Sequence, residues 1–128
     1  MDLQNNYTFL LEQIANTVTQ GRVSAVKAVR RQLVLTYWQI GKYIVEFEQK
    51  GAQKAIYGSE TIRRLSKDLS DQLGKGFSRT NLIYMRLCYL KYADVQLLSD
   101  QLTWGHFVEL IVIDHDLERQ FYEKQAIK

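Results

Sequence analysis

The stretch SETIRRLSKDLSDQLGKGFSRTNLIYMRLCYLKY (residues 59–92) decides the fold, because it has the pattern of two helices joined by a tight turn. Ser59 is a favourable N-cap, and apolar residues then recur at helical spacing as far as Leu73. Residues 74–77 (GKGF) carry two glycines and predict the turn, and Ser78 predicts the cap of a second helix over 78–93. Two capped helices and a short turn are typical of a helix-turn-helix unit.

Helices are also predicted before this pair. Residues 3–20 have apolar side chains at helical spacing, and Gly21 predicts a break after them. A second helix follows and ends near Gly51, where glycine readily takes the left-handed cap conformation. Residues 51–58 then predict a connector. The buried stripe expected on the second helix consists of Val26, Val29, Leu33, Tyr37, Ile40, Ile44 and Phe47.

After the pair, Ser99 or Asp100 marks a break, and residues 102–128 predict two short helices divided near Asp114. A strand over FVELIVI (107–113) is the alternative, since β-branched residues favour strands. The chain has 128 residues, no proline and only seven glycines, and its length suits one hydrophobic core. We therefore expect a single all-α, multi-helix domain over 1–128 that contains a helix-turn-helix-like unit.

Charge is distributed unevenly along the chain. The net charge is +3, but residues 21–92 carry fourteen basic and five acidic side chains, whereas residues 1–20 and 93–128 are each net acidic. Such segregation favours a polyanionic partner for the middle of the chain. Ordinary scatter of solvated surface charge is the alternative interpretation.

The helix pair predicts a DNA-binding surface. In a helix-turn-helix the second helix enters the major groove, and its first turns face the base edges. Here those turns offer Arg79, Thr80 and Asn81, followed by Tyr84 and Arg86. Arginine can form two hydrogen bonds with guanine, and asparagine can form two with adenine. The expected phosphate contacts are Ser78 with the free N–H groups of the helix start, Lys75 in the turn, and Arg63, Arg64 and Lys67 on the preceding helix. A common helix pair with a merely solvated basic face is the alternative.

A protein–protein or dimerisation module is the second hypothesis. Helix 78–93 carries two apolar sets, one of Leu82, Met85, Tyr89 and Tyr92 and the other of Ile83, Leu87 and Leu90. One set can face the core, and the other needs cover. A fully buried helix, which we favour, or a homodimer interface would supply that cover.

The sequence favours neither catalysis nor a membrane location. Nucleotide-binding, zinc-protease and serine-hydrolase motifs are absent, and the acidic residues at 109–123 have the pattern of a solvated face. His106 and His115 have no cysteine nearby, so we expect no metal and no cofactor. The single Cys88 fits a reducing compartment, and the chain shows neither a signal peptide nor an apolar run of membrane-spanning length. We expect a cytoplasmic protein that is not an enzyme.

Four segments resemble the N-terminal domain of the YhcG-type bacterial proteins, whose C-terminal half is a PD-(D/E)XK nuclease domain. The segments are YWQIGKYI (37–44), YGSETIRRLSKDL (57–69), GFSRTNLIYMR (76–86) and LTWGHFVELI (102–111), in the order of the family. Thr103 departs from the pattern, since the family usually has a proline before the tryptophan of WGH.

The resemblance implies a helix-turn-helix-like DNA-binding module, winged in some descriptions, that positions the associated nuclease domain on nucleic acid. It also implies that the nuclease domain itself is absent from this chain. The resemblance assigns Ser78, Arg79, Asn81 and Arg86 to the family motif GFSxxNLxxMR, in which Arg79 occupies the first variable position. The expected partners are DNA, the nuclease domain of the same family and a second copy of the chain.

Overall fold

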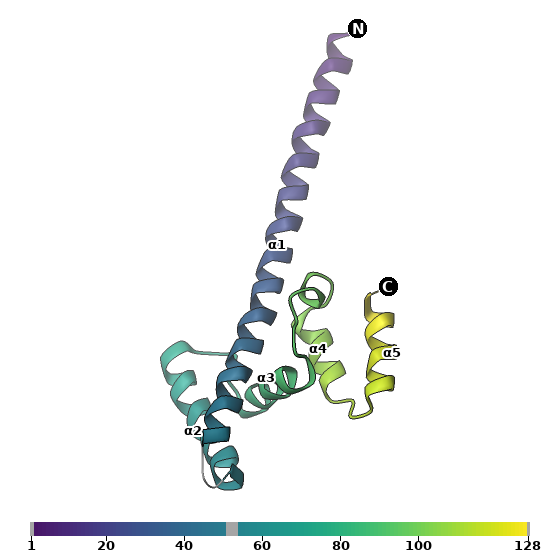
Figure 1. The fold of residues 1–128 in the computed structure, drawn as a ribbon. Coiled ribbons are helices and arrows are strands. Elements are labelled where there is room, and N and C mark those ends of the chain that lie inside the picture. The colour runs from purple at the N-terminus through teal and green to yellow at the C-terminus, as the bar shows by residue number, and fades with distance from the viewer. Residues whose placement is uncertain (1, 51–53, 128) are drawn as a thin grey trace.

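The computed structural model describes residues 2–50 and 54–127, and within them the chain is all-α (Figure 1). The elements are α1 (Leu3–Lys50), α2 (Lys54–Leu73), α3 (Arg79–Lys91), the short 3-10 helix η1 (Leu98–Asp100), α4 (Trp104–Ile111) and α5 (Asp116–Ile127). The all-α prediction is confirmed. No strand occurs in the described residues, so the alternative of a strand at 107–113 is wrong and the winged variant finds no support.

Helix α1 is one continuous helix of 48 residues, so the break predicted at Gly21 is wrong. A glycine inside a helix costs only about 1 kcal/mol relative to alanine, which is too little to end a helix by itself. A Cβ at Gly21 would meet no atom within 4 Å, so no contact requires a glycine there. In Figure 1 the N-terminal half of α1 extends away from every other helix, and all residues from 2 to 30 are exposed.

The stripe predicted to be buried on α1 is largely the wrong face. Val26, Val29 and Leu33 are exposed, and Val29 retains 70% of its accessible surface. The residues of α1 that are buried instead are Val34, Gly41, Ile44, Val45 and Glu48. Residues 34–48 are apolar on two faces, and α3 packs against the face that includes Gly41, because only a glycine permits the helices to approach so closely there. A Cβ at Gly41 would lie 2.0 Å from the carbonyl oxygen of Met85.

Helix α2 begins at Lys54, so Ser59 is not its N-cap and the predicted connector is wrong for residues 54–58. Residues 51–53 of that connector lie outside the described part of the chain. Lysine and alanine at positions 54 and 55 are good helix formers, which extends the helix toward α1. The predicted end of the helix at Leu73 is confirmed.

The turn between α2 and α3 follows the sequence prediction. Gly74 and Gly76 have φ angles of 92° and 107°, which side-chain-bearing residues rarely adopt. Ser78 caps α3, and its hydroxyl accepts a hydrogen bond of 3.1 Å from the backbone N–H of Asn81. The turn therefore fixes the direction in which α3 leaves α2.

Two clusters of buried side chains form the core around α3. One joins α1, α3 and α4 and contains Val34, Cys88, Tyr92, Val95, Leu102, Phe107, Leu110 and Ile111. The other joins α1, α2 and α3 and contains Ile44, Ile62, Leu82 and Met85. Helix α3 is not fully buried as predicted, because Ile83 and Leu90 on its second apolar face remain 43% and 49% exposed.

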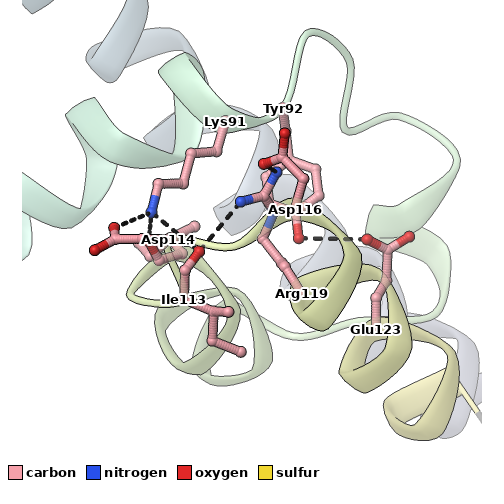
Figure 2. Close-up of polar contacts among 8 residues, drawn as sticks. Lys91, Tyr92, Ile113, Asp114, Asp116, Arg119 and Glu123 are labelled. Atoms are coloured by element: carbon pink, nitrogen blue, oxygen red, sulfur yellow. Dashed lines mark hydrogen bonds and ion pairs between the residues drawn. The ribbon is translucent and has the colours of Figure 1, made fainter.

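The C-terminal helices are divided near Asp114, as predicted. Lys91 of α3 donates hydrogen bonds to the backbone carbonyls of Ile111 and Ile113, just where α4 ends (Figure 2). Arg119 of α5 is buried, donates to the same Ile113 carbonyl at 3.2 Å, and lies 5.7 Å from the centroid of the Tyr92 ring. These cations at the C-terminal end of α4 hold α5 against the core.

Thr103 caps α4 through a reciprocal pair of hydrogen bonds with His106. The threonine hydroxyl accepts from the backbone N–H of His106 at 3.3 Å, and the threonine N–H donates to the imidazole Nδ1 at 3.1 Å. A proline at position 103 has no N–H to donate, so this capping box depends on the departure from the family pattern. Within residues 2–50 and 54–127, no helix combines the length and the apolar character needed to cross a membrane.

Candidate nucleic-acid interface

Four of the basic residues singled out in the sequence line one surface groove between α2 and the start of α3. They are Arg63, Arg64 and Lys67 on α2 and Arg79 on α3. The three α2 residues lie within five positions, and the turn brings Arg79 to the same side. Two acidic side chains, Glu60 and Asp71, line the groove as well, which leaves a formal charge of +2.

Two of these arginines already have carboxylate partners. Arg63 lies 2.8 Å from Glu60, and Arg64 lies 3.9 Å from Asp68. All four side chains are more than half exposed, and ion pairs of this kind contribute at most about 1 kcal/mol, so a phosphate can compete with the carboxylates. By contrast, Lys67, Lys75 and Arg79 form no ion pair in the described part of the chain. Lys75 is exposed in the turn and lines neither this groove nor the next.

A second groove on the same side holds Arg63, Arg79 and Arg86 together with Glu48 and Glu60. Arg86 is engaged there in a structural pair. Its Nε donates to both carboxylate oxygens of Glu48, at 2.9 and 2.8 Å. The Glu48 side chain is only 10% exposed and that of Arg86 35%, so the charge of Arg86 mainly compensates a carboxylate that α1 has buried.

The start of α3 exposes Ser78, Arg79 and Thr80 but not the side chain of Asn81. The amide Nδ2 of Asn81 donates to the carbonyl of Gly76 at 2.6 Å, and its Oδ1 accepts from the indole N–H of Trp104 at 3.0 Å. Asn81 therefore ties the turn and α4 to the first turn of α3.

Tyr84 is half-buried and packs against the larger core cluster. The ten predicted site residues therefore fall into three groups. One groove brings together Arg63, Arg64, Lys67 and Arg79. The side chains exposed at or beside the turn are Lys75, Ser78 and Thr80, and those that form contacts within the fold are Asn81, Tyr84 and Arg86.

The core thiol and the core phenol are not poised for chemistry near neutral pH. Burial raises the pKa of the Cys88 thiol from 9.0 to about 12. Burial, aided by the carboxylate of Glu123, raises the pKa of Tyr92 from 10.0 to about 12. Within the described residues, no three His, Cys, Asp or Glu side chains are grouped so that they could hold a metal ion.

An apolar groove between α1 and α2, of about 880 Å³, is a feature that sequence reasoning missed. Its α1 wall consists of Thr36, Ile40, Tyr43, Ile44 and Phe47, and its α2 side includes Leu65, Leu69, Leu73 and Phe77. The sequence did contain a signal for this groove. Residues 34–48 are apolar on two faces of the helix, and the single buried stripe that was predicted there accounts for only one of them.

Comparison with known proteins identifies the family of this chain. Residues 13–128 match the DUF1016 N-terminal domain. The chain belongs to this family. It is also 41% identical, over 100 residues, to the Escherichia coli (strain K12) protein named "Putative nuclease YhcG". The aligned residues make up 76% of this chain and 27% of that relative, so the chain spans about a quarter of the relative's length. No solved structure matches.

The match to the DUF1016 N-terminal domain covers most of α1 and all of α2 to α5. Both basic grooves, the turn and the apolar groove therefore lie inside the family domain.

Proposed function

We propose that this DUF1016 N-terminal domain binds DNA and positions an associated PD-(D/E)XK nuclease domain on it. The observation that carries the proposal is the groove in which Arg63, Arg64, Lys67 and Arg79 converge beside the start of α3. Cations from two consecutive helices on one surface are suited to adjacent phosphates of one strand, because lysine and arginine supply the sequence-independent part of DNA affinity.

The start of α3 adds to the attraction for phosphate. The first N–H groups of a helix lack partners within the helix, and the helix dipole places positive potential there. The Ser78 hydroxyl satisfies the N–H of Asn81, and the side chains of Arg79 and Thr80 are exposed beside it. We assign Ser78, Lys75 and the four groove residues to the phosphate backbone.

The residues that we propose for contacts with bases differ from those that the sequence predicted. Apart from Arg79, which is assigned to phosphate, the outward positions of the first α3 turns are Thr80 and Ile83, both exposed. Asn81, Tyr84 and Arg86 are positioning residues in this proposal, since each one holds α3 against another helix.

The nuclease part of the proposal rests on the family. The relative is named a nuclease, and about three quarters of its length lies outside the match. We assign strand cleavage to such an additional domain, propose no catalytic residue in this chain, and place its action in the bacterial cytoplasm, where DNA is accessible.

Fluorescence anisotropy with a labelled DNA duplex tests the proposal. We expect binding at low salt that weakens steeply as salt is added, because each neutralised phosphate releases condensed counterions. The double substitution Lys67→Ala and Arg79→Ala should weaken binding and reduce the slope of log K against log salt by about two.

Lys124→Ala is the matched control, since Lys124 is an exposed cation on α5, away from the grooves. It should leave both affinity and salt slope nearly unchanged. Absence of binding at low salt, or equal losses for the control and the double variant with unchanged circular dichroism, would refute the proposal.

A further inference from the structure

The exposed half of α1 carries an apolar stripe that no other described element covers. Its members recur every 11 residues, in the series Tyr7, Val18, Val29, Ile40 and the series Leu3, Ile14, Ala25, Thr36, Phe47. Eleven residues make almost three turns of an α-helix, so each series stays on one face of a nearly straight helix. All members between residues 3 and 33 are exposed.

The stripe runs directly into the apolar groove. Thr36, Ile40 and Phe47 continue the two series and also line the α1 wall of that groove. The face of α1 that enters the core, with Val34, Gly41 and Val45, lies on the other side of the helix. Within the described residues, the stripe and the groove thus form a continuous apolar surface along α1 from Leu3 to Tyr43.

In proteins most of the stability of a helix comes from the packing of its apolar face rather than from helix propensity, so an unpacked apolar stripe needs a partner. None of the described helices covers the stripe, because the N-terminal half of α1 points away from the others (Figure 1). The charged residues Glu12, Lys27 and Arg30 are off the stripe by helical spacing. Arg22 is on it, with a side chain long enough to extend to solvent.

We propose that α1 pairs antiparallel with α1 of a second copy of this chain, so that residues 3–18 of each copy lie in the apolar groove of the other. This occupant is favoured because every copy brings one exposed stripe and one open groove, and a two-fold axis fills both at once. The axis lies near Ala25, which places Leu3 opposite Phe47 and Val18 close to Leu33.

Size and sterics fit such a pair. At roughly 50 Å² for each half-exposed apolar side chain, the stripes and grooves of two copies would bury on the order of 1,200 Å², the area at which stable interfaces begin. Gly21 and Ala25 are small residues of the stripe close to the axis, where the helices approach most closely, and the monomer gives no other reason for a glycine at position 21. Helices α3 and α4 pack against the face of α1 opposite the stripe and leave the stripe accessible, while α2 forms the other wall of the groove.

Sedimentation equilibrium of the 128-residue chain tests the pairing over a wide range of concentration. We expect a monomer–dimer equilibrium that Ile14→Asp weakens by at least about tenfold, because the new carboxylate would be buried without a partner. Asn16→Asp is the control, since it adds the same charge two residues away on the opposite, equally exposed face. Leu73→Asp, at the α2 side of the groove, should weaken the dimer as well.

Cysteine substitutions test the orientation. Under oxidation Ala25→Cys should form a disulfide with itself across the two-fold axis, whereas Leu3→Cys should not, and Cys88 is fully buried and cannot compete. If the chain is a monomer at every concentration, the proposal is overturned. Binding of the exposed stripe to lipid vesicles would not rescue it. The proposal is also overturned by equal effects of Ile14→Asp and Asn16→Asp, by no effect of Leu73→Asp, or by efficient cross-linking at Leu3, which would indicate parallel helices. The proposal does not depend on DNA binding, and Lys67→Ala should leave the dimer unchanged.

Discussion

Gly41→Ala should destabilise the protein, although alanine is the better helix former. The added Cβ would lie 2.0 Å from the carbonyl oxygen and 2.7 Å from the carbonyl carbon of Met85, and 3.2 Å from the backbone nitrogen of Arg86. All three are backbone atoms, so no side-chain rotation relieves the overlap, and α1 and α3 must move apart by about 1.4 Å to bring the closest distance from 2.0 Å to the 3.4 Å at which ordinary van der Waals contact begins. Such overpacking costs about 1–3 kcal/mol and occasionally more.

The gain in helix propensity from Gly41→Ala is at most about 1 kcal/mol. Since the overlap is severe, we take the upper end of the steric cost and expect a net loss of about 2 kcal/mol, or roughly 8 °C in Tm for a domain of this size. Urea unfolding followed by tryptophan fluorescence measures it, because Trp38 and Trp104 both pack against the core clusters around α3.

Gly105→Ala is the control for this prediction. Gly105 also lies in a helix, but a Cβ there would be 3.6 Å from the nearest atom, the hydroxyl oxygen of Thr103, which is an ordinary contact. We expect this variant to be as stable as the natural sequence or slightly more stable. If Gly41→Ala proved equally stable, the close crossing of α1 and α3 would be wrong.

Two further predictions concern buried polar groups. Arg86→Ala should cost roughly 2–3 kcal/mol in the free energy of unfolding, because it leaves the Glu48 carboxylate buried without its partner, and Glu48→Ala in the same chain should restore part of the loss. A double-mutant cycle by chemical unfolding measures this, and additive losses would show that the two side chains are not coupled. Burial raises the pKa of Cys88 and Tyr92 to about 12, so the folded state favours their neutral forms. Their contribution to the free energy of unfolding is therefore fully present below pH 9 and is lost as pH rises through about 12. Tyr92→Phe should flatten the part of the stability profile above pH 10, and a profile identical to that of the natural chain would contradict the assigned burial.

The elements that the sequence predicted well are those fixed by local requirements. Gly74 and Gly76 adopt positive φ angles and Ser78 satisfies a free N–H, so the turn and both adjoining helix ends follow from single residues. Spacing likewise places Arg63 and Lys67 on one helix face. The predicted break at Gly21 was wrong because a glycine in a helix carries only a small cost, which is too little to end a helix by itself.

The roles of the α3 side chains could not be predicted, because their partners are distant in sequence. Asn81 meets Trp104, 23 residues later, and Arg86 meets Glu48, 38 residues earlier. Both had the residue type of a DNA contact, and only the packing shows that their hydrogen-bonding capacity is used within the fold. The same holds for α1, where periodicity identified an apolar face but could not tell whether the chain itself covers it.

The two proposed surfaces together fix a geometry on DNA. Arg86 and its groove lie at the level of Glu48 on α1, which is 23 residues from the proposed axis at Ala25. At 1.5 Å per residue this separation is about 35 Å, so two grooves of a dimer would lie roughly 70 Å apart, or two turns of B-form DNA.

A duplex of about 30 base pairs should therefore bind the dimer far more tightly than one of about 12, because the second contact becomes intramolecular. Ile14→Asp should abolish this preference for length while leaving affinity for the short duplex unchanged. If the natural chain dimerises and binds DNA, yet affinity is independent of duplex length, the two grooves cannot engage one duplex and the antiparallel arrangement would have to be abandoned.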